Sequence, residues 1–210
     1  TDPTLNDPIA REYLDIIGTH LYGGGIGDYP LARQHNKEIW MTEHLMNNNS
    51  ANDWSWNDAL IFAKELHGCM EANFNAYIWW YLKRHYSMLG DGEFGTVKGE
   101  LLPRGYVLSH YAQYATDRRR IAVDKIASNN DILVTAYEGT SDYTLIIQNQ
   151  GSALIPTVQF ELPQAFTSVT GVETTATKNM QTASVNATKN NQAVSLTINP
   201  KSILSIKIKK

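Results

Sequence analysis

The pattern of apolar residues changes near residue 120, and this change constrains the fold more than any other feature of the sequence. Up to that point, apolar runs of strand length alternate with stretches in which apolar residues recur every three or four positions. This alternation indicates an α/β architecture with a parallel sheet. Beyond it, short strand-like runs follow one another with Gly, Asn and Pro between them, which is typical of a β-sandwich. We therefore expect two domains, residues 1–120 and 121–210.

The first half is expected to hold three strands that alternate with helices. The strands are predicted at 14–22, 39–43 and 75–81, and the helices at 7–13, 56–73 and 103–115, with a short helical segment within 30–38. A closed barrel of parallel strands and helices has eight strands. Three strands cannot form one, so the sequence predicts only a part of such a barrel.

The second half reads as strands throughout. They are predicted at 132–137, 144–149, 157–162, 168–172, 193–198 and 202–208, and the polar segment 174–192 is predicted to be a solvated hairpin or a long turn. This half contains no Trp. We interpret it as a structural side domain, with a carbohydrate-binding role as the alternative, because aromatic side chains form the platforms on which sugar rings pack.

Glu43 comes two residues after the apolar run Ile39-Trp40-Met41 and is flanked by the polar residues Thr42 and His44. In a β/α barrel the catalytic groups lie at the carboxyl ends of the strands. Glu43 is therefore a candidate catalytic residue. The alternative is an ordinary strand whose last residue meets solvent.

Composition excludes several other classes of protein. The formal charge is −3, which favours neither nucleic acid nor an acidic membrane surface. There is no apolar run long enough to span a bilayer, and the first residues lack the pattern of a signal peptide. The single cysteine, Cys69, allows no internal disulfide and is expected to be a small apolar residue on a helix face. His20 and His44 lack a compact ligand motif, so we predict no metal site and no cofactor.

Several stretches of the first half resemble the later barrel strands of glycoside hydrolase family 30. They are His20-Leu21-Tyr22-Gly23, Trp40-Met41-Thr42-Glu43-His44 and Trp79-Trp80-Tyr81-Leu82-Lys83-Arg84-His85-Tyr86, followed by Pro103-Arg104-Gly105-Tyr106. The second half resembles the β-sandwich side domain of that family. The branch that the chain resembles most is the glucuronoxylanases, which are glucuronoarabinoxylan endo-1,4-β-xylanases.

The resemblance implies a role for each matching residue. Glu43 would end barrel strand seven as the catalytic nucleophile. The remaining implied site residues all bind substrate or lie beside the nucleophile: His20 and Tyr22 at the end of strand six, Trp80 and Tyr81 at the end of strand eight beside the sugar subsites, and Arg84 and Tyr86 at the 4-O-methylglucuronic acid branch of the xylan.

The chemistry of these residue types agrees with the implied roles. A retaining glycosidase needs one ionised carboxylate as nucleophile and a second, protonated one about 5 Å away as acid/base. A neighbouring donor such as Tyr22 can hold the nucleophile ionised and oriented. The planar fork of Arg84 suits the carboxylate of a uronic acid. The alternative for Arg84 is a surface ion pair.

The sequence departs from the family in its acid/base. The family's acid/base is a Glu that follows Asn at the end of strand four, and this chain contains no Asn-Glu pair. Glu93 and Glu100 follow the third predicted strand and are the loop carboxylates that could approach the cleft. We therefore expect the first barrel strands and the acid/base to lie on an N-terminal segment outside this sequence. The chain would then pair with that segment, associate with itself or behave poorly alone, because a half-barrel leaves sheet edges uncovered.

Three functions remain open on this basis. The first is a retaining endo-β-1,4-xylanase that hydrolyses glucuronoxylan and reads its glucuronic acid branch. The second is an inactive fragment or a xylan-binding module. The third is a β-glucosidase or glucosylceramidase-like member of the same family. A polymeric substrate implies a secreted or cell-surface protein.

Overall fold

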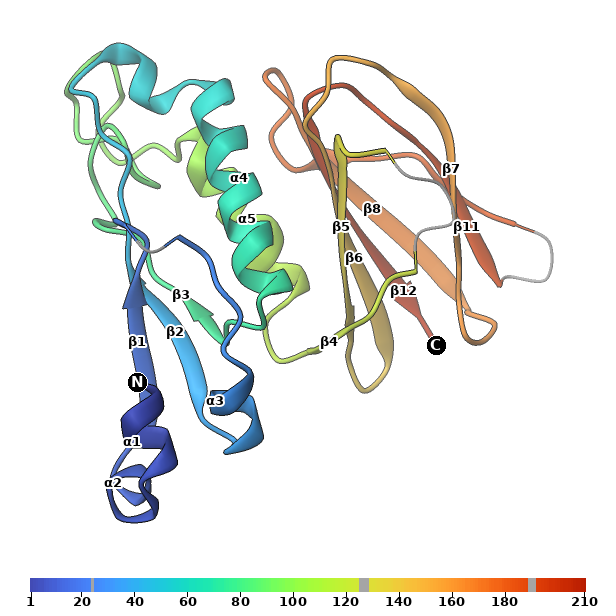
Figure 1. The fold of residues 1–210 in the computed structure, drawn as a ribbon. Helices are drawn as coiled ribbons and strands as arrows, with labels where there is room; N and C mark the ends of the chain where they lie inside the picture. Colours follow the sequence, from blue (N-terminus) through green and yellow to red (C-terminus); the bar gives the residue numbers. More distant parts are fainter. Residues whose placement is uncertain (24, 125–128, 189–191) are drawn as a thin grey trace.

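The computed structural model describes residues 1–23, 25–124, 129–188 and 192–210. A small parallel sheet, a pair of helices and two antiparallel sheets follow one another across the molecule (Figure 1). The predicted order, an α/β part followed by an all-β part, is confirmed.

The parallel sheet has the strand order β1-β2-β3. Its strands are β1 (Ile16–His20), β2 (Glu38–Glu43) and β3 (Ala76–Tyr77). Short helices precede the first two strands, namely α1 (Asp2–Asn6), α2 (Pro8–Glu12) and α3 (Pro30–Gln34). One apolar core holds them together and includes Leu5, Ile17, Ile39, Met41 and Phe74.

Side-chain caps mark the start of two helices and of one 3-10 turn. The carboxylate of Asp7 accepts hydrogen bonds from the first N–H groups of α2, and the hydroxyl of Ser55 accepts one from the N–H of Asp58 at the start of α4 (Trp56–Glu71). Ser50 and Asp53 form a capping box around a single turn of 3-10 helix, Ala51–Trp54. The caps at Asp7 and Ser55 explain why the predicted starts of these two helices agree closely with the structure.

The third predicted strand, 75–81, is much shorter than expected, and the prediction was wrong for residues 78–81. The N–H of Asn75 donates to the carbonyl of Ile39, and the next such bond runs from the N–H of Ile78 to the carbonyl of Met41. Three residues on this segment therefore pair with two on β2. The extra residue breaks the two-residue repeat of a strand. Trp80 still donates its N–H to the carbonyl of His44 at 3.0 Å, so the chain continues along the end of β2 as an irregular segment.

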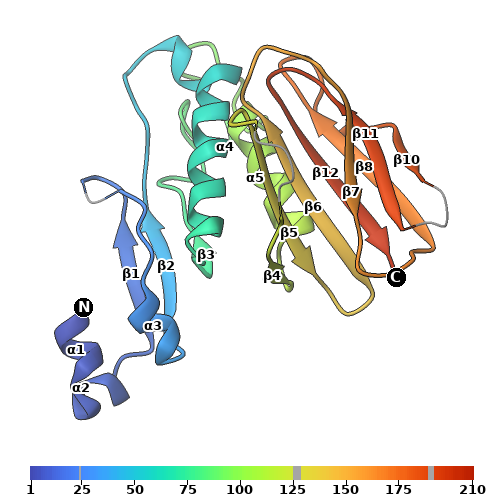
Figure 2. The same ribbon diagram turned by 45° about the vertical axis from the view of Figure 1, so that its right-hand side comes forward.

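Helices α4 and α5 (Pro103–Tyr114) lie side by side between the parallel sheet and the antiparallel sheets (Figure 2). The core between these helices and the antiparallel strands includes Phe62, Leu66, Val107, Ile146 and Ile203. The helix pair therefore joins the two parts of the chain through apolar contacts.

The second half forms two antiparallel sheets, of order β4-β5-β6-β12-β8-β9 and β10-β11-β7. The strands are β4 (Arg119–Ile121), β5 (Ile132–Glu138), β6 (Asp142–Asn149), β7 (Ile155–Glu161), β8 (Ser168–Thr174), β9 (Gln181–Thr182), β10 (Val185–Ala187), β11 (Ala193–Ile198) and β12 (Ser202–Lys209). Both sheets contribute to one core that includes Val134, Ile147, Val194, Leu196 and Ile206.

The predicted strands of this half are present, and three further ones were missed. β9 and β10 fall within 174–192, which was predicted to be a hairpin or turn; residues 189–191 of it lie outside the described residues. They were missed because they are short and polar. β4 pairs with β5 across the predicted domain boundary at residue 120.

Cys69 lies fully buried on α4, in the same core as Ile39 and Met41. Burial raises the pKa of its thiol to about 12, which agrees with the predicted apolar role. Among the helices that the structure describes, none is both long enough and apolar enough to cross a membrane.

Candidate active site

Glu43 is the last residue of β2, at the carboxyl edge of the parallel sheet, and lies opposite His20, the last residue of β1. The register shifts by one residue at this point, because Thr19 pairs with Met41 while His20 pairs with Glu43. Thr42 is thus the extra residue of a bulge. Strict alternation would place Glu43 on the covered face of Ile39 and Met41, and a bulge changes the direction of the side chains that follow it.

Tyr22 is hydrogen-bonded to Glu43. Burial and the neighbouring Glu43 raise the pKa of the Tyr22 hydroxyl, which therefore keeps its proton and remains a donor. The ring of Tyr22 also packs against the rings of His20 and His44, with centroids 5.9 Å and 5.2 Å away. The sequence predicted His20, Tyr22 and Glu43 as neighbours, and the structure brings them together.

His44 follows Glu43 in the sequence, and its ring is held by the carboxylate of Glu65 on α4. The Nδ1 atom of His44 lies 2.8 Å from a carboxylate oxygen of Glu65, and the buried hydroxyl of Tyr77 donates to the same carboxylate. Burial and Glu65 together raise the pKa of Tyr77 strongly. Glu65 falls within the helix predicted at 56–73, and no role was predicted for it. Its position, three residues after buried Phe62, was the available signal, because a carboxylate among apolar residues needs a partner.

Trp80 and Tyr81 form an exposed aromatic pair beside this edge. Their ring centroids are 4.4 Å apart, and 40% and 43% of these two residues is exposed. The guanidinium of Arg84 lies over the Tyr81 ring, 5.1 Å from its centroid. Two flat rings and a cation thus face solvent together, at the end of the strand predicted for residues 75–81.

Tyr86 is buried, in contrast to the other predicted substrate-binding residues. Burial raises the pKa of its hydroxyl, and the charge and hydrogen bond of Arg84 oppose this effect. Tyr86 also contributes to the raised pKa of Tyr22. Tyr86 therefore interacts with both Arg84 and Tyr22.

Arg104, in the sequence stretch that follows these residues, holds two of the loops in place. Its side chain is 1% exposed and donates to the backbone carbonyls of Asp53 and Tyr86, the latter at 2.9 Å. Its guanidinium also lies 5.3 Å from the Trp79 ring centroid. The sequence analysis used Arg104 only as part of a resemblance, and its structural role comes from the tertiary fold.

The acid/base is unassigned. Glu93 is directed at His85, at 4.0 Å from its ring, and its side chain is 66% exposed; Glu100 is exposed. His85, Asp91 and Glu93 also bring possible metal-ligating atoms within 4.8 Å of one another, although no metal site was predicted from the sequence.

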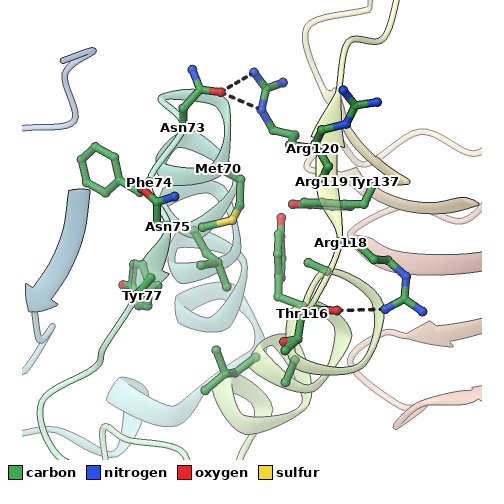
Figure 3. Close-up of a pocket in the computed structure, with 16 residues that line it drawn as sticks. Met70, Asn73, Phe74, Asn75, Tyr77, Thr116, Arg118, Arg119, Arg120 and Tyr137 are labelled. Carbon is green, nitrogen blue, oxygen red and sulfur yellow. Dashed lines mark hydrogen bonds between the residues drawn. The ribbon is translucent and has the colours of Figure 1, made fainter. Parts of the chain in front are cut away.

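A cavity of about 700 Å³ lies away from this edge, where α4 and α5 meet β4 and β5 (Figure 3). Its lining includes Tyr77, Tyr111, Tyr137 and Arg120, and the guanidinium of Arg120 closes one side by donating to Asn73. None of the predicted site residues lines it. The candidate site is therefore an open edge of the sheet rather than this cavity.

No family model matches this chain. The glucuronoxylanase XynC of Bacillus subtilis (strain 168) is 33% identical over 159 residues, which are 72% of this chain and 36% of XynC. The chain thus spans about a third of the length of this relative.

Solved structures agree with this relationship. The family 30 subfamily 8 xylanase Xyn30A of Clostridium acetobutylicum superposes with a TM-score of 0.85 at 28% identity, over 100% of this chain and 52% of that protein. A family 30 endoxylanase of Clostridium papyrosolvens C71 gives a TM-score of 0.82 at 25% identity, over 100% and 52%. The predicted resemblance to the C-terminal part of the family 30 glucuronoxylanases is confirmed.

Proposed function

We propose, from this resemblance to glucuronoxylanases of glycoside hydrolase family 30, that the chain is the C-terminal part of a retaining endo-β-1,4-xylanase with Glu43 as its nucleophile. The observation that carries the proposal is the position of Glu43. It ends a parallel strand, lies opposite His20 and accepts a hydrogen bond from Tyr22. β1, β2 and β3 would be barrel strands six to eight, and residues 121–210 a β-sandwich side domain.

In this mechanism Glu43 attacks the anomeric carbon of a xylose unit and forms a glycosyl–enzyme ester, while the leaving sugar oxygen takes a proton from the acid/base. Water, deprotonated by the same acid/base, then breaks the ester and releases Glu43. The proton that Tyr22 shares with Glu43 keeps this carboxylate oriented for attack. His44, fixed by Glu65, supports the same segment of backbone.

The acid/base is proposed to lie on an N-terminal barrel segment. The uncovered apolar surface near the start of the chain supports such a partner: Ile9, Tyr13 and Ile16 are 73%, 82% and 41% exposed. β1 is also an edge strand that pairs only with β2 in the three-stranded sheet. An exposed edge and an apolar face are the features that a neighbouring strand and helix would cover.

Arg84 is proposed to bind the glucuronic acid branch. Among the described residues Arg84 forms one ion pair, with Asp91 at 3.9 Å, and 47% of the Arg84 side chain is exposed. At that distance and exposure the pair with Asp91 is weak, so the guanidinium retains donors for a uronate. Tyr81 beneath it would carry the neighbouring sugar ring. A xylan-degrading role implies an extracellular location.

The test is activity of the chain combined with an N-terminal barrel segment, in cis or in trans, on glucuronoxylan. Glu43→Gln should abolish turnover while leaving binding of xylo-oligosaccharides in place. If the combined protein binds glucuronoxylan but never cleaves it, the xylan-binding module becomes the better description, because the exposed Trp80, Tyr81 and Arg84 would serve it equally well.

A further inference from the structure

We propose that His85, Asp91 and Glu93 form a binding site for one divalent transition-metal ion such as Zn²⁺. The three side chains lie in the segment that follows the aromatic pair and come from the two ends of a short loop. One ligand atom from each lies within 4.8 Å of the other two. Ligands that share one ion at about 2.1 Å are themselves about 3 to 4 Å apart, so a small movement of the exposed Glu93 side chain would bring its oxygen within reach of the same ion.

The first supporting observation concerns His85 itself. Its side chain is 4% exposed, and its Nδ1 atom has no hydrogen-bond partner among the described residues. Nδ1 faces the Glu93 carboxylate at 4.0 Å, which is too long for a hydrogen bond. A buried polar atom without a partner is costly, and an ion between Nδ1 and Glu93 would satisfy both groups.

The second observation concerns Asp91. One of its carboxylate oxygens, Oδ1, accepts the N–H of Glu93 at 3.1 Å, which fixes the direction of the side chain. The other, Oδ2, is buried and accepts no hydrogen bond; its nearest cation is Arg84 at 3.9 Å. Asp91 thus presents one oxygen as an unused ligand.

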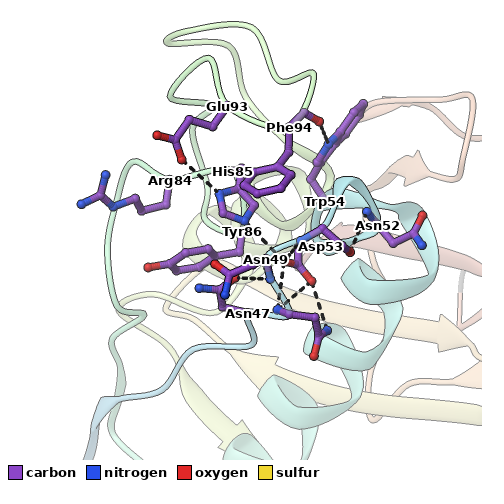
Figure 4. Close-up of polar contacts among 12 residues, drawn as sticks. Asn47, Asn49, Asn52, Asp53, Trp54, Arg84, His85, Tyr86, Glu93 and Phe94 are labelled. Atoms are coloured by element: carbon purple, nitrogen blue, oxygen red, sulfur yellow. Dashed lines mark hydrogen bonds and ion pairs between the residues drawn. The ribbon is translucent and has the colours of Figure 1, made fainter.

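The far side of His85 has the arrangement usual for a metal-bound histidine. Nε2 lies 3.4 Å from the carboxylate of buried Asp53, so that His85 stands between Asp53 and Glu93 (Figure 4). Asp53 is itself held by the N–H groups of Asn48 and Ser50. Metal-binding histidines donate the second ring N–H to such a carboxylate, which orients the ring and fixes the tautomer.

The donor set decides the class of ion. An imidazole with two carboxylates suits Zn²⁺, Mn²⁺ or Fe²⁺, whereas Ca²⁺ and Mg²⁺ prefer oxygen ligands throughout. Three protein ligands leave at least one position for water. A bound ion would tie the 91–93 turn to His85 and, through Asp53, to the turn before α4.

The experiment is calorimetric titration of Zn²⁺ into the chain after treatment with EDTA, with Ca²⁺ titrated in parallel. We expect one equivalent of Zn²⁺ to bind at least tenfold more tightly than Ca²⁺. Glu93→Gln should weaken Zn²⁺ binding at least tenfold, and this variant should fold because Glu93 is 66% exposed. Asp91→Asn should act in the same direction, whereas Glu100→Gln, an exposed carboxylate of the same loop, should leave the affinity unchanged.

Absence of Zn²⁺ binding by the wild-type chain would overturn the proposal. A Glu93→Gln variant that binds Zn²⁺ with wild-type affinity would also overturn it, because the ion would then be bound by other residues. Tighter binding of Ca²⁺ than of Zn²⁺ would also contradict the assigned donor set.

Discussion

The hydroxyl of Tyr22, just beyond β1, donates a hydrogen bond to the carboxylate of Glu43 at the end of β2. The two residues are far apart in sequence and meet because parallel strands end at the same edge of a sheet. The bulge at Thr42 and the hydrogen bond from Tyr22 together determine where the Glu43 carboxylate points.

The first prediction concerns this hydrogen bond. Tyr22→Phe removes the donor and keeps the ring, and hydrogen bonds to charged groups contribute about 1.5 to 3 kcal/mol. In the combined protein we expect kcat on glucuronoxylan to fall roughly 10- to 100-fold, with a smaller change in KM. Reducing-sugar release measures it. Tyr114→Phe, at the end of α5 and away from this edge, is the matched control. Unchanged kcat in Tyr22→Phe would remove Tyr22 from the site.

The second prediction concerns Glu65 as a positioning residue. Glu65→Gln removes the negative charge that holds His44 at 2.8 Å but keeps an acceptor for Tyr77. We expect kcat to fall by about three- to tenfold with little change in KM, because His44 loses the charged partner that fixes its position. Glu71→Gln on the same helix, which removes only an exposed pair with Arg120, is the control. Equal effects of the two substitutions would indicate a merely structural role.

Much of the fold was accessible to sequence reasoning, for identifiable physical reasons. Asp7 and Ser55 cap helices through local contacts, and the Ile39–Met41 run is apolar on a buried strand, so neighbouring residues decide these elements. The irregular path of residues 78–81 was not accessible, since it depends on an extra residue in the pairing with β2. The partners of Glu65 and Arg104, and the Asp53 carboxylate that faces His85, are also distant in sequence, and only the folded chain brings them together.

The third prediction concerns Arg84. Arg84→Ala should reduce kcat/KM on glucuronoxylan about 30- to 100-fold, because a bidentate pair with the uronate is lost, while activity on unbranched xylan stays within a factor of two or so. Arg84→Lys should restore only part of the loss, since an ammonium cannot form the two parallel hydrogen bonds. Parallel assays on glucuronoxylan and on unbranched xylan measure the ratio of the two kcat/KM values. Equal losses on both substrates would argue against recognition of the branch.

The fourth prediction is a pH dependence of stability. His110 of α5 is fully buried between Ser205 and Thr174, at 2.7 Å and 2.8 Å, and burial lowers its pKa to about 3. The unfolded chain therefore binds a proton on His110 below about pH 6.5, whereas the folded chain does not. The contribution of neutral His110 to the free energy of unfolding is therefore present above about pH 6.5 and is lost as the pH falls toward 3. The loss between pH 6.5 and pH 5 is about 2 kcal/mol.

Urea unfolding at pH 7 and pH 5 measures this dependence. The difference between the free energies of unfolding at the two pH values should shrink in His110→Gln, because glutamine keeps hydrogen-bonding groups but cannot titrate. His35→Gln is the control, because His35 lies on the remote α3 segment and should leave the difference unchanged. A wild-type chain that is equally stable at both pH values would contradict the assignment of a neutral, buried His110.

The central claim is that Glu43 is the nucleophile, and covalent labelling tests it most directly. A dinitrophenyl glycoside of fluorinated xylobiose has a leaving group that departs without protonation, so it labels a competent nucleophile even when the acid/base is weak. The combined protein would be incubated with this reagent, digested and analysed by peptide mass spectrometry. Our account predicts a single glycosylated peptide with the sugar on Glu43, and no label in Glu43→Gln. A label on any other carboxylate, with Glu43 unmodified, would contradict it.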